Sequence, residues 1–171
     1  MTRPVHRKAL NIERSINMFL EINFAIPESM QDAINFQDSE FSAIELDKWV
    51  DCIFLKSGAG KRSETVLQID VYVRTKGKII GSDRHGEECA RLAEAIYEAL
   101  HVRAIQIYNF ATPTSPALLA KRKVLVRRSD GTLKEPEEET IQGIEDGIAR
   151  RTLTYRFELP DDIAGTEYYD D

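Results

Sequence analysis

Two segments of the chain alternate between apolar and polar residues over most of their length. Residues 65–74 read TVLQIDVYVR, and residues 151–159 read RTLTYRFEL. In each, every second side chain is aliphatic or aromatic: Leu67, Ile69, Val71 and Val73, then Leu153, Tyr155, Phe157 and Leu159. Successive side chains of a β-strand point to opposite faces, so these segments can bury their apolar face only within a sheet. We therefore expect a sheet with one covered face.

A third strand is expected just before the first of these segments. Residues 46–55, LDKWVDCIFL, are rich in β-branched and aromatic residues, and the loop LKSGAGKRSET joins them to residues 65–74. An antiparallel hairpin with a flexible tip is expected. Gly60 and Lys61 resemble part of a phosphate-binding loop, but Arg62 stands where that loop needs Ser or Thr, and a strand follows instead of a helix. We therefore expect no nucleotide site.

Two segments have the apolar spacing of amphipathic helices. The first, near the N-terminus, carries a stripe formed by Ala9, Ile12, Ile16, Phe19 and Leu20. The second follows a cap at Ser82 or Asp83, and its stripe consists of Cys89, Leu92, Ala93, Ile96 and Leu100. Each helix therefore has one face to bury against the sheet.

The rest of the chain predicts shorter strands and a long insertion. Residues 104–110 are expected to form a strand, and residues 121–128, KRKVLVRR, a basic edge strand. The insertion between Pro113 and Arg150 is expected to be a long loop or hairpin, and the glycines within residues 140–149 disfavour a helix there.

Together these elements predict an α+β fold: a two-layer sandwich in which a largely antiparallel sheet packs against two α-helices. The 171 residues suit a single domain, residues 1–171, with flexible termini at residues 1–6 and 160–171. We see no apolar run of membrane-spanning length and no secretory signal, so folding in a cytoplasm is expected.

The residues that carry most enzyme and metal chemistry do not form a convincing set. His85 and Cys89 have the spacing of ligands on one helix face, but Cys52 and His101 are the only candidates to complete a zinc site. Two buried free thiols are the preferred interpretation of the cysteines. No Ser or Cys lies in a nucleophile elbow, so we expect neither catalysis nor a cofactor.

Charge is segregated along the chain. The formal net charge is −6, which disfavours general nucleic-acid coating. A basic cluster nevertheless stands against acidic residues 135–139 and an acidic C-terminal tail. The cluster and the hairpin tip supply the candidate contacts to other subunits or proteins: Lys61, Arg62, Lys121, Arg122, Lys123, Arg127 and Arg128. Such segregation suits a ring in which one subunit's basic edge meets the next subunit's acidic surface; a solvated edge strand protected by charge is the alternative.

The element order resembles a known family. A helix precedes the strand DKWVDCIFL, the strand VLQIDVYVRTKG, the helix GEECARLAEAIYEAL, the strand and turn IQIYNFATPTSP, and the strand RTLTYRFEL. This order is similar to that of the tail terminator, or tail-completion, proteins of long-tailed bacteriophages, from Ala9 to Leu159. The insertion between Pro113 and Arg150 is longer than in the smallest members.

The resemblance implies a structural role without catalysis. Such proteins form a ring, usually a hexamer, on the last ring of the tail tube, where they end tube polymerisation and present a face to the head-side connector or stopper protein. The partners implied are other copies of the chain, the tail tube protein and the connector, with genome DNA passing through the lumen without sequence-specific binding. The implied location is the tail or neck of the virion, assembled in the host cytoplasm, with no membrane partner.

Two other functions remain open. One is another neck component, such as a head-completion, stopper or adaptor protein. The other is a small α+β enzyme with a site built from His85, Asp83 and Asp70.

Overall fold

The structure is a computed structural model, and it contains two α-helices and seven strands among the residues that it describes. Those residues are 4–37, 40–57, 63–74, 84–100, 104–110, 114–126, 136, 138–145 and 147–159. The helices and short helical turns are α1 (Pro4–Leu20), η1 (Glu21–Ala25), η2 (Gln31–Ala33) and α2 (Arg84–Ala99). The strands are β1 (Ile34–Phe36), β2 (Lys48–Ser57), β3 (Ser63–Arg74), β4 (Ile105–Asn109), β5 (Ala117–Val126), β6 (Glu138–Glu145) and β7 (Ile148–Leu159).

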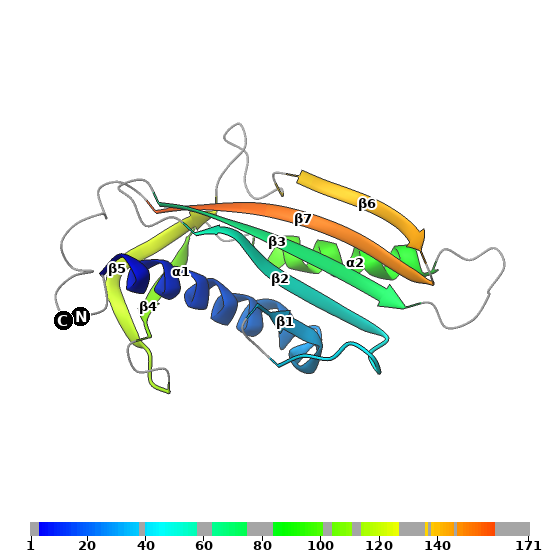
Figure 1. Cartoon of the computed structure of the whole chain (residues 1–171), viewed down its shortest axis with the longest axis horizontal. Coiled ribbons are helices and arrows are strands. Elements are labelled where there is room, and N and C mark those ends of the chain that lie inside the picture. Colours follow the sequence, from blue (N-terminus) through cyan, green and yellow to red (C-terminus); the bar gives the residue numbers. More distant parts are fainter. Residues whose placement is uncertain are drawn as a thin grey trace.

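The sheet has the order β1-β2-β3-β7-β5-β4, and β6 also pairs with β7 (Figure 1). Every pairing is antiparallel except that of β1 with β2. The pairing of β3 with β7 is the longest and runs without a shift from Ser63↔Leu159 to Arg74↔Ile148. These are the two alternating segments. The antiparallel pairing of β2 with β3 confirms the predicted hairpin.

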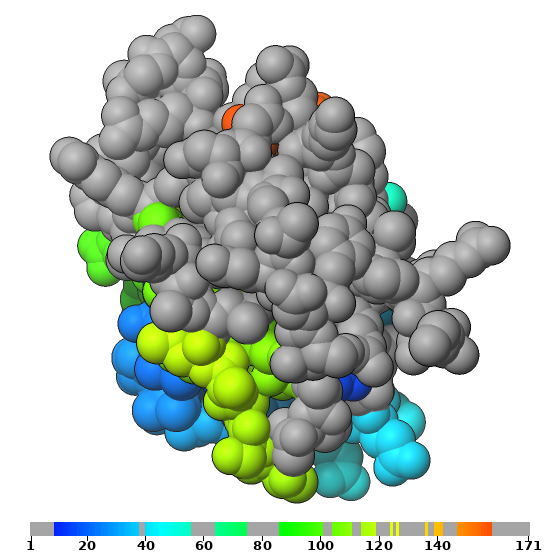
Figure 2. All heavy atoms as spheres, turned by 90° about the vertical axis from the view of Figure 1, so that its left-hand side faces the viewer, coloured from blue at the N-terminus to red at the C-terminus, as the bar shows by residue number. Residues whose placement is uncertain are grey.

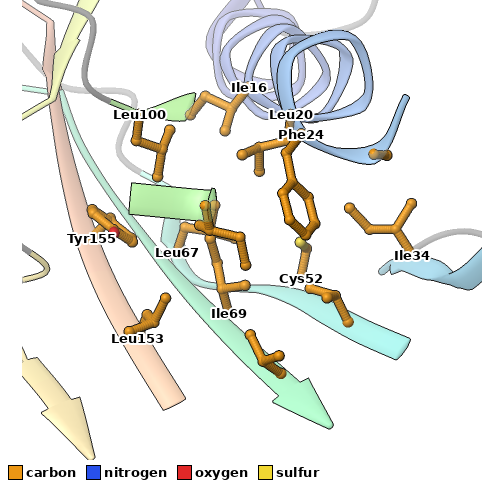
Figure 3. Packing of buried hydrophobic residues seen from close by; sticks show 14 of the residues in the cluster. Ile16, Leu20, Phe24, Ile34, Cys52, Leu67, Ile69, Leu100, Leu153 and Tyr155 are labelled. Atoms are coloured by element: carbon orange, nitrogen blue, oxygen red, sulfur yellow. The ribbon is translucent and has the colours of Figure 1, made fainter. Parts of the chain in front are cut away.

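One hydrophobic core joins both helices to a single face of the sheet. Ile12, Ile16 and Leu20 of α1 are at most 1% exposed, as are Leu92 and Ile96 of α2. They belong to the same cluster as the alternating residues of β3 and β7, and Figure 3 shows Phe24 pointing toward Cys52 of β2. Burying each such side chain contributes about 1.5–3 kcal/mol. The predicted two-layer α+β sandwich is therefore confirmed.

Polar side chains on the buried side of α1 fix this helix against the β4 region. Ser15, which is 1% exposed, donates from Oγ to the Asn11 carbonyl (2.6 Å) and accepts from the Tyr108 N–H (2.9 Å). Asn11 Oδ1 accepts from the Phe110 N–H (3.0 Å). The two side chains are four residues apart, on one face of the helix. α1 therefore satisfies backbone donors at this end of the sheet that would otherwise be open to another strand.

Two details bear on the sequence-based expectation. The basic segment around residues 121–126 is an edge over only part of its length, because Lys123 and Val124 pair with β4 whereas Leu125 and Val126 pair with β7. The insertion contains β6, which forms a hairpin with β7, and a hairpin is one of the two forms expected for it. The true outer strand beside β7 is therefore acidic β6 along most of its length.

Candidate functional site

Most of the predicted contact residues lie outside the described part of the chain. Lys61, Arg62, Arg127 and Arg128 are outside the described residues. Lys121, Arg122 and Lys123 lie on β5, where Lys123 pairs with Gln106 of β4. Figure 2 views the molecule from this end, where the yellow-green segment around residues 114–118 is at the surface. The side chains of Lys121, Arg122 and Lys123 lie outside the described part of the structure, as do the other four residues.

Among the described residues, three strands pair on one side alone: β1 with β2, β4 with β5 and β6 with β7 (Figure 1). Beside β4, side chains of α1 accept from the Tyr108 and Phe110 N–H groups. β1 and β6 lie on opposite sides of the paired strands β2, β3 and β7. A strand paired on one side presents unpaired N–H and C=O groups that can hydrogen-bond to another chain. The molecule thus has two distinct backbone edges for association.

Exposed isoleucines lie on β6 and in the segment before β1. Ile141, in the middle of β6, is 67% exposed. On the other side, η1 and the turn after it lead directly into η2 and β1, and there Ile22 and Ile26 are 53% and 50% exposed. Scattered exposed aliphatic residues are common on protein surfaces, but Ile141 lies on the open strand β6 itself. The β6 edge therefore combines open backbone groups with apolar surface, whereas Ile22 and Ile26 lie in the segment that precedes β1 in the chain.

The sheet face opposite the helices carries a polar network centred on Asp70 of β3. Its carboxylate is 2% exposed and accepts from Arg150 Nη2 (2.9 Å), Thr152 Oγ1 (2.6 Å) and Gln68 Nε2 (2.9 Å). Tyr72 OH lies 3.5 Å away. Burial and the nearby charge of Asp70 raise the pKa of Tyr72 to about 12. Hydrogen bonds from residues of β3 and β7 thus stabilise this buried carboxylate.

Aromatic and guanidinium groups extend this network across three strands. The rings of Trp49 and Tyr72 stack with centroids 4.8 Å apart and an interplanar angle of 11°. Arg74 lies over Trp49 and Arg150 over Tyr72, each at 5.4 Å from the ring centroid. Arg74 also donates to the carbonyls of Leu46 and Ala43. These contacts connect β2, β3, β7 and the segment before β2. They should therefore make this face of the sheet rigid.

A groove lies on the helix-covered side, between α2 and the β6–β7 hairpin. Its volume is about 530 Å³. Ala90, Ala93, Leu153 and Tyr155 supply much of its lining, and Glu94, Tyr97, Pro136, Glu139 and Arg151 complete it. Arg151 Nη1 pairs with Glu139 at 2.7 Å. The groove forms because α2 packs on β3 and β7, whereas the sheet continues one strand further to β6.

The residues considered for metal or thiol chemistry do not assemble within the described part of the chain. Cys52 and Cys89 are free and buried, as expected. Burial raises the pKa of both thiols, to about 11 for Cys89. No group of three or more His, Cys, Asp or Glu side chains suited to a metal ion occurs among the described residues, which do not include His101. No described helix is long and apolar enough to cross a membrane.

Comparison with known proteins adds little to this geometry. No protein-family model and no curated protein matches the chain. Four chains of solved structure match it. One of these has only a sequence identifier for a name; it is 12% identical, with a TM-score of 0.49, over 86% of this chain and 94% of its own. A likeness at this level carries no conclusion, so the two strand edges and the groove are the features from which a function must be inferred.

Proposed function

We propose that this chain is a structural virion protein of a long-tailed bacteriophage, a tail terminator that forms a ring on the head-proximal end of the tail tube. The ring would end tube polymerisation and present its other face to the head-side connector, with DNA passing through the lumen. The observation that carries the proposal is that the sheet has two different open edges, β1 and β6, on opposite sides.

A closed ring requires two different, complementary surfaces on every subunit. Strand direction makes these two edges compatible. β1 is parallel to β2, and three successive antiparallel pairings lead from β2 through β3 and β7 to β6. β6 therefore runs antiparallel to β1. When copies are related by rotation about an axis roughly along the strands, β6 of one subunit and β1 of the next can pair as antiparallel strands.

The side chains at the edges support the same arrangement. Ile141 on β6 would lose exposed apolar surface in such an interface. Burial of apolar surface contributes roughly 25 cal/mol per Å². The end of the sheet near β4 is instead occupied by α1, through Ser15 and Asn11. The proposal therefore assigns subunit contacts to β1 and β6.

An Ile141→Lys variant tests this proposal. A charge in the middle of an exposed edge strand opposes pairing with another strand but costs the monomer little, because Ile141 is 67% exposed. Leu118→Lys is a matched control, since Leu118 is an aliphatic residue on β5 that is 56% exposed. Sedimentation velocity should show rings for the parent chain and for Leu118→Lys, and smaller species for Ile141→Lys. Equal assembly of all three would refute the assignment of the interface to β6.

A further inference from the structure

The groove between α2 and the β6–β7 hairpin contains a polar group without a partner. Tyr155 lines the groove and is 1% exposed, and its hydroxyl has no hydrogen-bond partner within the described part of the chain. Glu139 and Tyr97, which line the same groove, are the two titratable side chains whose charges act on this hydroxyl. The hydroxyl end of Tyr155 therefore lies at the groove. Because a buried hydroxyl without a partner is costly, a ligand group that hydrogen-bonds to it gains affinity.

The hydroxyl of Tyr155 keeps its proton at neutral pH. Burial is the largest cause that raises the pKa of Tyr155 above its ordinary value of 10.0, and the charge of Glu139 adds to it. A protonated phenol can donate one hydrogen bond and accept another. A hydroxyl or carbonyl oxygen on a ligand meets this requirement.

The rest of the groove is suited to the apolar body of a small organic molecule. Its volume of about 530 Å³ falls within the usual range for ligand pockets, about 300–1,000 Å³. Ala90 and Ala93 of α2 have short side chains, which leave room beside the helix, and Leu153 of β7 adds apolar surface. Tyr97 supplies an aromatic ring. An aromatic ring on the ligand can pack against these side chains.

The charges in the groove favour a cation over an anion. Two carboxylates, Glu94 and Glu139, and one cation, Arg151, line it. Arg151 Nη1 pairs with Glu139 at 2.7 Å, so these two charges offset each other. Glu94 is exposed and forms no hydrogen bond or ion pair with another described residue. An ammonium group is the complement of this single carboxylate.

We propose that this groove binds an arylalkylamine, with its ammonium group at Glu94, its ring against Ala93 and Leu153, and a hydroxyl or carbonyl oxygen at the Tyr155 hydroxyl. All of these residues belong to one chain. The site therefore goes beyond the proposed ring and does not depend on it.

Tyramine is the probe, because it combines an ammonium group, an aromatic ring and a hydroxyl group. Titration of the full-length chain, followed by NMR of the ligand, measures the Kd, which should be about 1 mM or below for a molecule of this size. Phenethylamine, which lacks the hydroxyl, should bind about 5- to 10-fold more weakly. The anion 3-(4-hydroxyphenyl)propionate should bind at least about threefold more weakly than tyramine.

Three variants test the assigned residues. Tyr155→Phe should weaken tyramine binding about 5- to 10-fold but leave phenethylamine binding unchanged, because phenethylamine has no hydroxyl to bond there. Glu94→Gln should weaken the binding of both amines about threefold, since the carboxylate is exposed. Glu87→Gln is the matched control: Glu87 is also an exposed acid of α2, but it does not line the groove. It should bind both amines like the parent chain.

Tyr155→Phe also gives a readout that needs no ligand. Because the hydroxyl has no partner, its removal should leave the urea midpoint of unfolding unchanged or raise it. A lower midpoint would show that the hydroxyl is already satisfied in the folded chain and would overturn the proposal. So would a tyramine titration without saturation up to about 10 mM. Equal tyramine binding by the parent chain and Tyr155→Phe would overturn it as well.

Discussion

Two aspartates that face each other across β2 and β3 should respond in opposite ways to the same substitution. Asp70 and Asp51 are directly paired in the register. Asp70 is 2% exposed and accepts hydrogen bonds from Arg150, Thr152 and Gln68. Asp51 is only partly buried and accepts from Asn35 Nδ2 (3.0 Å). Asparagine is nearly isosteric with aspartate, so the pair of variants isolates the effect of charge.

Asp70→Asn should destabilise the fold. The asparagine oxygen can still accept from Thr152, but its amide would face the donors of Arg150 and Gln68. The loss comprises a charged hydrogen bond worth about 1.5–3 kcal/mol and a neutral one worth about 1 kcal/mol. The side chain of Arg150 is 33% exposed, so solvent screening places the ionic part at the lower end of its range. We expect a total loss of about 2–3 kcal/mol.

Asp51→Asn should leave stability unchanged or slightly higher at neutral pH. Burial is the largest cause that raises the pKa of Asp51 above its ordinary value of 3.8, and the charge of Asp70 adds to it. Because the folded-state pKa is raised, the ionised carboxylate opposes folding. That penalty is absent below the ordinary pKa and develops as the pH rises through the folded pKa. Asparagine carries no such penalty.

Urea unfolding at pH 7, followed by circular dichroism, measures both effects. With a slope of about 2–3 kcal/mol per M, Asp70→Asn should lower the midpoint by about 1 M. Asp51→Asn should not lower it. Equal losses for the two variants, or no loss for Asp70→Asn, would refute the inference that the network is centred on Asp70.

Three further predictions concern α1, α2 and the cysteines. Ser15→Ala should cost about 1–3 kcal/mol in the same urea assay, because it leaves the Tyr108 N–H without its acceptor; a loss below 0.5 kcal/mol would contradict this role. Arg91 pairs with Glu28 and Glu88, but its side chain is 47% exposed, so Arg91→Ala should lower the free energy of unfolding by at most about 1 kcal/mol. A larger loss would show that the ion pair with Glu28, in the turn after η1, contributes more than expected. Cys52 and Cys89 should react slowly with a thiol reagent at pH 8 and quickly in urea, because burial raises the pKa of each thiol; fast labelling of the folded chain would show that the core is open there.

The parts of the fold that depend on local periodicity could be predicted from the sequence. Both helices carry a stripe of apolar residues at helical spacing, and residues of these stripes, such as Ile16 and Ile96, are buried in the core. Alternation placed Leu67, Ile69 and Leu153 on the covered face, where they are. These features depend only on which side of an element meets the core, so short-range pattern is sufficient to predict them.

The hairpin β6–β7 shows where this reasoning fell short. The glycines within residues 140–149 were correctly taken to disfavour a helix. Both of them belong to the β6–β7 hairpin. Gly147 has a φ of 75° in the two-residue connection between Glu145 and Ile148, where the dipeptide Asp-Gly is a strong hairpin signal. Gly143 lies at the register shift between Gln142 and Ile144, where a bulge adds a residue. The Asp-Gly pair could have revealed this hairpin.

The candidate site was harder to predict, because it depends on which strands become neighbours. The charge of residues 121–128 suggested an edge, yet Leu125 and Val126 of β5 pair with β7, and β6 is the outer strand along most of β7. The segment around Asp70 does not indicate its partners, yet donors from β3 and β7 enclose its carboxylate. Long-range pairings set both outcomes, and a single segment carries no information about them.

The proposed ring is tested most directly by electron microscopy of the purified chain, alone and mixed with growing tail tubes of a long-tailed bacteriophage. We expect closed rings with an open lumen, with hexamers as the expected stoichiometry, and we expect the rings to bind one end of the tubes and stop their elongation. A chain that remains monomeric at all concentrations, together with tubes that elongate equally in its presence, would contradict the account.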